Sequence, residues 1–195
     1  MSERLRNVII VTGTPGTGKT ALSRALAKAL GARYINLTQF VFERKLHSGI
    51  DRERRTKIMD LARTRSSLRR ELRAVTVPVV VDTHTPEGIV PREMVRQVFV
   101  LRCHPKVLEA RLRAKKWKAK KIRENVLAEI VDSCLTAAVK QYGWRKVIQL
   151  DTSRMSVRRS AGMIKSAILG KLGRRIKVNW LERLEREGLL DRYLE

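Results

Sequence analysis

The 195-residue chain contains few of the residues that build disulfide-rich or zinc-binding proteins. Cysteine occurs only at Cys103 and Cys134, and the three histidines are His47, His84 and His104. Their spacing matches no zinc-site pattern, and two cysteines cannot hold together a disulfide scaffold. We therefore expect reduced thiols, no structural zinc site and a cytoplasmic protein.

Long apolar runs are also absent. No stretch approaches the roughly 18–20 apolar residues that a membrane-spanning helix needs. The first apolar run, residues 7–12, lies a few residues from the start of the sequence, without the cleavable apolar segment of a secretory leader. We expect a protein without a membrane span, built as a single domain over residues 1–195, because this length suffices for a hydrophobic core.

Acidic residues are scarce: 19 Asp and Glu face 43 Lys and Arg, for a net charge of +24. The cations concentrate in residues 52–73, 111–123 and 154–177. Charged surfaces usually mix both signs, and a surplus of one sign repels itself unless a polyanion binds it. A solvated surface and a surface for RNA are both open interpretations, and the size of the surplus favours RNA.

The most specific pattern in the chain is residues 13–20, GTPGTGKT, which fits the phosphate loop G-x-x-x-x-G-K-[ST] at every fixed position. The apolar run before it and a helical stretch at 19–30 after it complete the strand–loop–helix context. Backbone N–H groups of such a loop surround phosphate oxygens, and the helix N-terminus adds partial positive charge. We expect Lys19 to reach the β- and γ-phosphates and the Thr20 hydroxyl to bind Mg²⁺. The residues predicted to bind ATP in this loop are Gly13, Thr14, Gly16, Thr17, Gly18, Lys19, Thr20 and Ala21.

Short apolar segments alternate with helical ones along the whole chain. The strand candidates are 8–11, 33–37, 77–82, 98–102 and 146–150, and the helix candidates are 19–30, 39–46, 52–73, 105–116, 122–142 and 157–169. This alternation predicts an α/β fold of the P-loop NTPase type, with a five-stranded parallel sheet flanked by helices. Two basic insertions, a flap at about 38–73 and a lid at about 113–123, interrupt it. An amphipathic tail at about 178–195 is expected to pack on the body or on a partner.

An acid and a histidine follow the strand at 77–82. Asp82 ends this strand next to the phosphate loop, where it is placed to bind Mg²⁺ directly or through water. His84 is placed to orient or deprotonate a water, or it caps the next loop, and a strand-end acid also commonly starts a turn. We predict Lys19, Asp82 and His84 as catalytic residues and Thr20 with Asp82 as the metal-binding pair.

The lid segment is densely cationic around a single aromatic residue, Trp117. A lid that closes over the triphosphate, an RNA contact in which Trp117 stacks on a base, and a solvated surface are all compatible with this pattern. Asn125 and Glu129 lie one helical turn apart, a common surface pairing that indicates no function on its own.

Taken together, these segments resemble the adenylate kinase isoenzyme 6 family of archaea and eukaryotes. The matching segments are 12–20, 34–36, 80–84, 98–102, 109–117 and 121–130, and residues 180–190 resemble the tail of archaeal members. The resemblance implies a five-stranded parallel sheet with a flap that binds a monophosphate and a lid. It also implies Mg²⁺-dependent ATPase and adenylate kinase activity, and a role in small ribosomal subunit maturation with a ribosomal protein and rRNA. We expect a monomer.

The chain departs from the family pattern at residues that in the family suit a monophosphate such as AMP. The family usually has Gly-Asp after the second strand and an arginine in the next helix, where this sequence has Thr38-Gln39 and Phe42. The lid arginine corresponds to Lys115, which keeps the charge but loses the fork that grips phosphate at two points. Lys115 is still predicted to contact ATP, and AMP remains an open second substrate.

Three functions are compatible with these features. The excess charge and altered flap favour an ATPase of small-subunit assembly that contacts rRNA or a ribosomal protein. The flap-and-lid layout alone suits a metabolic nucleoside monophosphate kinase. A non-enzymatic, nucleotide-gated RNA-binding module would leave Asp82 and His84 without a chemical role.

Overall fold

The apolar segments form one parallel sheet in the computed structural model, which describes residues 7–51, 56–85, 88–171 and 177–194. The strands of this sheet are β1 (Val8–Gly13), β2 (Arg33–Asn36), β5 (Val79–Asp82), β6 (Val95–Arg102) and β7 (Val147–Asp151). Their order is β2-β5-β1-β6-β7, and every pair is parallel. The predicted five-stranded parallel sheet is confirmed, and all five strands end at one edge.

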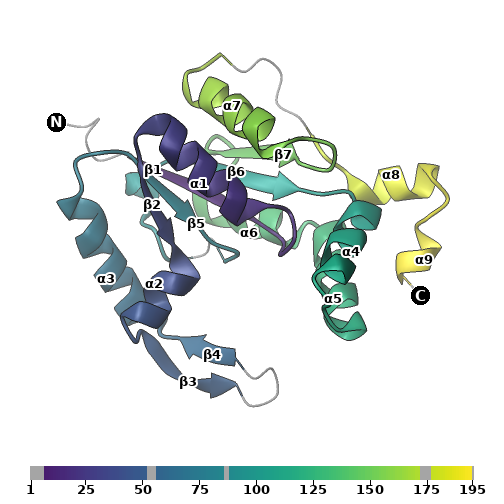
Figure 1. Cartoon of the computed structure of the whole chain (residues 1–195), viewed down its shortest axis with the longest axis horizontal. Coiled ribbons are helices and arrows are strands. Elements are labelled where there is room, and N and C mark those ends of the chain that lie inside the picture. Colours follow the sequence, from purple (N-terminus) through teal and green to yellow (C-terminus); the bar gives the residue numbers. More distant parts are fainter. Residues whose placement is uncertain (1–6, 52–55, 86–87, 172–176, 195) are drawn as a thin grey trace.

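Helices cover both faces of the sheet (Figure 1). They are α1 (Lys19–Leu30), α2 (Leu37–Glu43), α3 (Leu61–Ala74), α4 (Pro105–Ala114), α5 (Ala119–Ile130), α6 (Ser133–Tyr142), α7 (Val157–Ile168), α8 (Trp180–Arg186) and α9 (Asp191–Leu194). None of these helices is both long and apolar enough to cross a membrane.

Alternation along the strands divides the core between the two faces, because neighbouring side chains of a strand point to opposite sides. In β1, Ile9 and Val11 belong to a buried cluster that α1 and α7 complete. Val8 and Ile10 belong to the opposite cluster, which α2, α3 and α6 cover. Both faces are therefore apolar, as a parallel sheet requires, and the polar chemistry is confined to its carboxyl edge.

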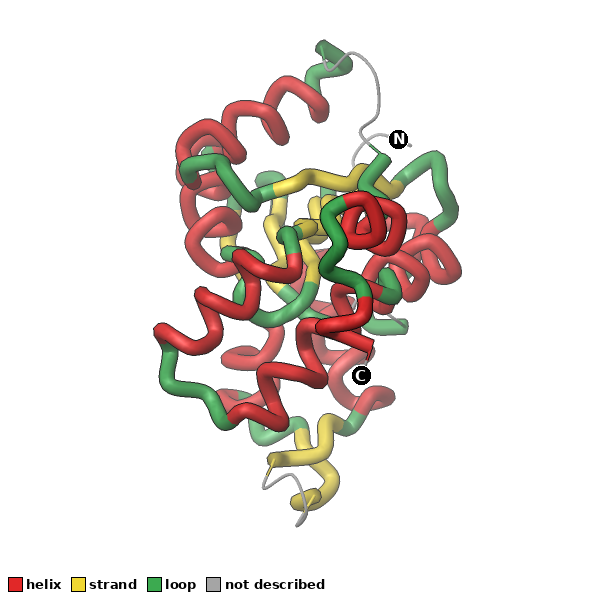
Figure 2. Tube along the Cα trace, turned by 90° about the vertical axis from the view of Figure 1, so that its right-hand side faces the viewer, coloured by secondary structure: helices red, strands yellow, loops and turns green. Residues whose placement is uncertain are grey.

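The flap differs from the prediction. Residues 52–73 were expected to be helical, but the chain first forms an antiparallel hairpin of β3 (His47–Asp51) and β4 (Thr56–Met59), and only then enters α3. Residues 52–55 lie outside the described part of the chain. The hairpin projects from the body in both views, with Ile58 49% exposed (Figures 1 and 2). Such short strands bury little apolar surface, so the sequence carries no alternating pattern that reveals them.

The single helix predicted at 122–142 is also wrong. The chain forms α5 and α6, and between them Asp132 adopts a left-handed backbone with φ of 57°. Aspartate tolerates this conformation better than most residues, and its carboxylate here accepts a hydrogen bond from Arg102. The break lets α5 pack on α4 and the tail while α6 packs on the sheet.

The tail packs back on the body rather than standing free. Leu184 of α8 and Tyr193 of α9 are buried in a third apolar cluster with α4 and α5. Trp180, at the start of α8, is 1% exposed. Gly188, with φ of 64°, separates the two tail helices. The amphipathic pattern of the tail is thus satisfied within the chain.

Candidate active site

The phosphate loop joins β1 to α1, and two glycines give it its shape. Gly13 has φ of 143°, and a Cβ there would lie 2.4 Å from the Leu101 carbonyl oxygen. Gly18 is the N-cap of α1 with φ of 97°, and it has no side chain to cap the first turn. The N–H groups that begin α1 are therefore available to an anion, in the arrangement that binds phosphate.

Lys19 lies at the centre of this loop. Its ammonium donates a hydrogen bond to the carbonyl oxygen of Thr14 at 3.1 Å. Burial lowers the pKa of Lys19, and the nearby charge of Asp82 acts in the opposite direction. The cation is thus held at the phosphate loop, and its contact with the phosphates of ATP stays a prediction.

Asp82 ends β5 and is 3% exposed. One carboxylate oxygen, Oδ2, accepts hydrogen bonds from Thr20 Oγ1 at 2.8 Å, Asn36 Nδ2 at 2.9 Å and Tyr34 Oη at 3.0 Å. The structure thus brings together the predicted metal-binding pair, Thr20 and Asp82. Tyr34 and Asn36 were not among the predicted site residues, although their position at the end of a neighbouring strand was a usable signal.

The residues around Asp82 fit Mg²⁺. This ion prefers hard oxygen ligands and is usually held by one or two protein groups together with substrate phosphates and water. Thr20 and Asp82 offer a hydroxyl and a carboxylate that already touch each other. Within the described residues, no group of three or more His, Cys, Asp or Glu could hold a metal on its own. The donor set therefore suits an ion that arrives with ATP.

His84 lies two residues after Asp82, and its side chain is exposed. The protein atoms packed around its ring lower its pKa, the Lys19 cation lowers it further, and Asp82 acts against both. The lowered pKa favours the neutral imidazole, the form that can accept a proton or orient a water. Residues 86 and 87 of the loop that His84 was expected to cap lie outside the described part of the chain.

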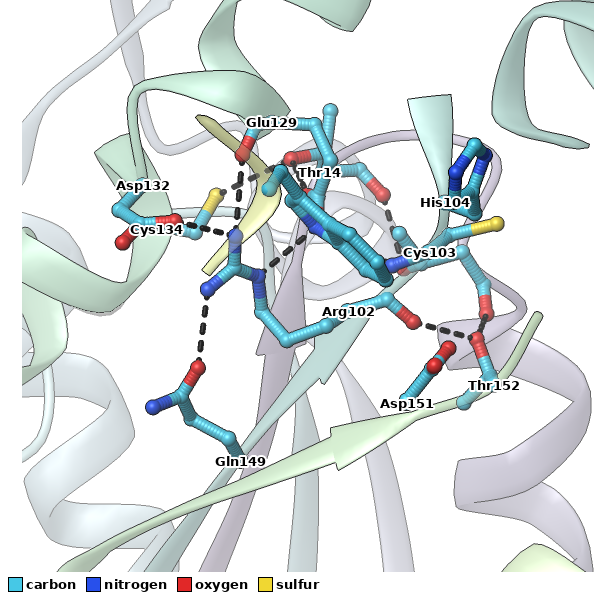
Figure 3. Close-up of polar contacts among 12 residues, drawn as sticks. Thr14, Arg102, Cys103, His104, Glu129, Asp132, Cys134, Gln149, Asp151 and Thr152 are labelled. Atoms are coloured by element: carbon cyan, nitrogen blue, oxygen red, sulfur yellow. Dashed lines mark hydrogen bonds and ion pairs between the residues drawn. The ribbon is translucent and has the colours of Figure 1, made fainter. Parts of the chain in front are cut away.

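Glu129 is buried beneath the loop and is therefore not part of a surface pairing with Asn125. It is 2% exposed, and its Oε2 accepts a hydrogen bond from the Thr14 hydroxyl at 2.6 Å (Figure 3). Its Oε1 accepts from Arg102 Nε at 2.8 Å and from Trp180 Nε1 at 2.8 Å. The signal was available in the sequence, because Glu129 interrupts the apolar stripe that includes Val126 and Ile130 on α5.

A hollow of about 420 Å³ adjoins the phosphate loop. Its lining residues are Gly16, Thr17, Gly18, Leu22, Arg111, Ala114, Lys115, Thr152, Met155, Val157 and Ser160. Its volume and its largely apolar lining suit a nucleoside. Lys115 lies at the end of α4, exposed at this hollow, and its charge also lowers the pKa of Lys19. The predicted lid cation is thus close to the loop.

A larger hollow, about 650 Å³, lies between α4, α5 and α9. Trp117 and Tyr193 line it, together with Arg113 and Arg123. No residue of the phosphate loop reaches it. We therefore place the candidate nucleoside site at the smaller hollow, which Gly16, Thr17 and Gly18 of the phosphate loop line. Lys19 and the Thr20–Asp82 pair belong to the same loop region.

Similarity to known proteins identifies the family and supports the fold. A family model described as "AAA domain" matches residues 9–132. A protein of Pyrococcus abyssi named "Putative adenylate kinase" is 35% identical over 179 residues, which cover 90% of this chain and 92% of that protein. A protein of Methanocaldococcus jannaschii with the same name is 31% identical, covering 90% and 93%. Shikimate kinase from Acinetobacter baumannii, solved with shikimate, has a TM-score of 0.57 at 20% identity over 88% of this chain and 97% of that one, which supports the fold alone.

Proposed function

The chain belongs to the family of adenylate-kinase-like P-loop kinases, and on that premise we propose that it transfers the γ-phosphoryl group of Mg·ATP to water, to AMP or to both. The observation that carries this proposal is the phosphate loop, whose free helix N-terminus and Lys19 lie beside the Thr20–Asp82 pair. Transfer of this kind depends mainly on positioning and on charge stabilisation, which these groups supply.

Each residue would have a distinct task. Backbone N–H groups of the loop hold the phosphates, and Lys19 moves from the Thr14 carbonyl to the β- and γ-phosphoryl oxygens. Thr20 and Asp82 would hold Mg²⁺, which neutralises the charge that develops on those oxygens. His84, in its neutral form, orients the attacking water or accepts its proton.

The flap favours hydrolysis over transfer to AMP. Phe42 stands where the family has an arginine, and it is 64% exposed. The nearby Arg44 forms an ion pair with Glu71, and its guanidinium carbon lies 4.5 Å from the ring centre of Phe40. A guanidinium engaged in this way would have to leave both partners to bind a monophosphate, so we expect AMP to bind weakly.

A product count tests the activity. Purified protein is incubated with Mg·ATP, with and without AMP, and ADP, AMP and free phosphate are measured. Phosphate release that AMP does not change supports an ATPase. Two ADP formed for each AMP consumed, with little phosphate, supports a monophosphate kinase. Absence of both reactions, with or without RNA, would refute the proposal.

We further propose that the protein acts as a cytoplasmic monomer in small ribosomal subunit assembly and contacts rRNA or a ribosomal protein. A metabolic kinase is equally consistent with the relatives. The observation in favour of RNA is a surface hollow of about 530 Å³ against α3, lined by Arg44, Leu46, Arg63, Ser66, Ser67 and Arg70. Arg63 and Arg70 offer two guanidinium groups and the serines two hydroxyls, whereas Arg44 is paired with Glu71. No carboxylate lines the hollow, which suits a phosphate backbone.

A salt titration tests this contact. RNA affinity should fall steeply between about 50 and 200 mM salt, because counterions are released when several phosphates are neutralised. The double variant Arg63→Ala/Arg70→Ala should weaken binding and reduce the salt slope. The control is Arg158→Ala/Arg159→Ala, which removes the same charge from exposed positions of α7. A flat titration, or equal losses in both variants, would contradict RNA binding at α3.

A further inference from the structure

The second residue of the phosphate loop, Thr14, holds the resting position of Lys19. Its carbonyl oxygen accepts hydrogen bonds from Lys19 Nζ at 3.1 Å and from the Thr17 hydroxyl at 2.9 Å. Its own hydroxyl donates to Glu129 at 2.6 Å, and Thr14 as a whole is 1% exposed. One buried residue therefore connects the loop and its cation to the carboxylate of α5.

Glu129 is in turn held by groups from two other parts of the fold. At the end of β6, Arg102 Nε and the backbone N–H of Cys103 donate to Oε1 at 2.8 and 3.1 Å (Figure 3). From the tail, Trp180 Nε1 donates to the same oxygen at 2.8 Å. Arg102 is fixed further by Gln149 at 2.9 Å. The carboxylate cannot move without breaking several buried, charge-assisted hydrogen bonds.

We infer that Glu129 and Trp180 are positioning residues for the phosphate loop, through which the C-terminal tail holds the loop in the shape that binds ATP. The chain of contacts runs from Trp180 to Glu129 and to Thr14, whose carbonyl would release Lys19 when the phosphates bind. A loop already fixed in its binding shape loses less entropy when ATP arrives, so affinity rises. The inference rests on the proposed ATP binding and is independent of AMP and RNA.

This connection makes the tail a means of regulating ATP binding. A partner that draws α8 away from α5 would free one bond to Glu129 and loosen Thr14. By thermodynamic linkage, ATP bound at the loop would stabilise the tail on the body to the same extent.

Calorimetric titration with Mg·ATP tests the first link. Thr14→Val keeps the shape but removes the hydroxyl, and we expect the dissociation constant to rise about tenfold, since a hydrogen bond to a charged group is lost. Thr14→Ser restores the hydroxyl and should recover most of the affinity. If valine binds ATP as tightly as the wild type, or serine as weakly as valine, the positioning role of this hydrogen bond is refuted.

The second link needs a control for general loosening of the tail. Trp180→Phe removes the indole donor, and Leu184→Ala removes buried apolar contact from the same helix while the hydrogen bond from Trp180 to Glu129 is kept. We expect both to lower the melting temperature, but only Trp180→Phe to raise the dissociation constant, by about fivefold for one lost hydrogen bond. Equal shifts in both variants, or none in Trp180→Phe, would overturn the inference.

A double-mutant cycle joins the two links. If Trp180 acts through Glu129 and Thr14, the variant carrying Thr14→Val and Trp180→Phe should bind ATP about as weakly as Thr14→Val alone. Fold-changes that multiply would show two independent effects and contradict the inference. A wild type that binds no ATP would instead refute the proposed function, so the two failures are distinguishable.

Discussion

The two sides of the carboxyl edge are built differently. On the ATP side, the charged groups that support the phosphate loop are buried and hydrogen-bonded: Asp82 is 3% exposed, and Glu129 and Arg102 are 2% and 1%. On the flap side, the comparable positions are open, with Thr38, Gln39 and Phe42 all exposed. A buried polar group without partners costs free energy, so the ATP side tolerates few alternative arrangements, whereas the flap is not constrained in this way.

This difference indicates which substrate the protein binds specifically. A site made of buried, mutually bonded groups is preorganised and loses little freedom when its ligand binds. A site made of exposed side chains on a projecting hairpin and on α2 must be ordered by its ligand. We therefore expect specificity for Mg·ATP from the structure of the free protein, and a weaker interaction with a monophosphate.

The largest expected effect comes from breaking the buried network. Arg102→Ala leaves the Glu129 carboxylate buried without its ion pair, and we expect a loss of about 3–5 kcal/mol in the free energy of unfolding. Urea denaturation measures this loss. Arg113→Ala is the control, because its ion pair with Glu109 is exposed on the arginine side and should change stability by less than about 1 kcal/mol. Similar losses in both variants would show that the network is not specially constrained.

Removal of Lys19, the cation of the phosphate loop, should have the second-largest effect. Lys19→Ala deletes the group that reaches the transferred phosphoryl oxygens, and we expect ATP turnover to fall by about a hundredfold or more, with little change in melting temperature. Lys28→Ala, at an exposed position in the last turn of the same helix, is the control. Turnover by Lys19→Ala at the wild-type rate would refute the assignment of the site.

Substitution of His84 is expected to affect the hydrolysis step and not the binding of ATP. His84→Ala should slow hydrolysis about tenfold to a hundredfold while the dissociation constant for ATP changes little, because the ring acts on water rather than on the phosphates. Since its pKa is lowered, the neutral form persists below the usual value near 6.5. Hydrolysis by the wild type should therefore decline only as the pH falls through that lowered pKa, and the variant should lack this decline. Equal losses of binding and rate would mark His84 as structural.

The smallest effect is expected when the family's arginine is restored in the flap. Phe42→Arg restores an arginine at the family's position, and we expect the KM for AMP to fall about threefold to tenfold, the equivalent of one solvent-exposed charge-assisted contact. The KM for ATP should not change. Thr38→Ala, another exposed position of α2, serves as the control. If Phe42→Arg leaves AMP kinetics unchanged, the family's arginine position is not what weakens AMP binding here.

On the ATP side, the sequence predicted only those features whose contacts lie close together along the chain. The phosphate loop is one contiguous motif, and Asp82 follows a recognisable apolar strand, so the structure places both as expected. Glu129, in contrast, receives hydrogen bonds from residues 115, 27 and 51 positions away, and no local pattern brings those together. A charged residue inside an apolar stripe was the one available sign of its burial.

The flap could not be predicted for the opposite reason. The β3–β4 hairpin is stabilised mainly by its own backbone pairing, and its exposed position removes the periodicity that reveals a buried strand. The break at Asp132 depends on a hydrogen bond to Arg102, which only the folded chain supplies. Sequence patterns indicate burial well. The hairpin depends instead on backbone pairing, and the break at Asp132 depends on a hydrogen bond from a distant residue.

Calorimetric titration of the wild-type protein with Mg·ATP and, separately, with AMP tests the contrast between the two sides most directly. The buried, mutually bonded ATP side predicts that Mg·ATP binds at least about tenfold more tightly than AMP, a difference of about 1.4 kcal/mol. AMP bound as tightly as Mg·ATP would show that the exposed flap is a formed site, and would contradict the central claim.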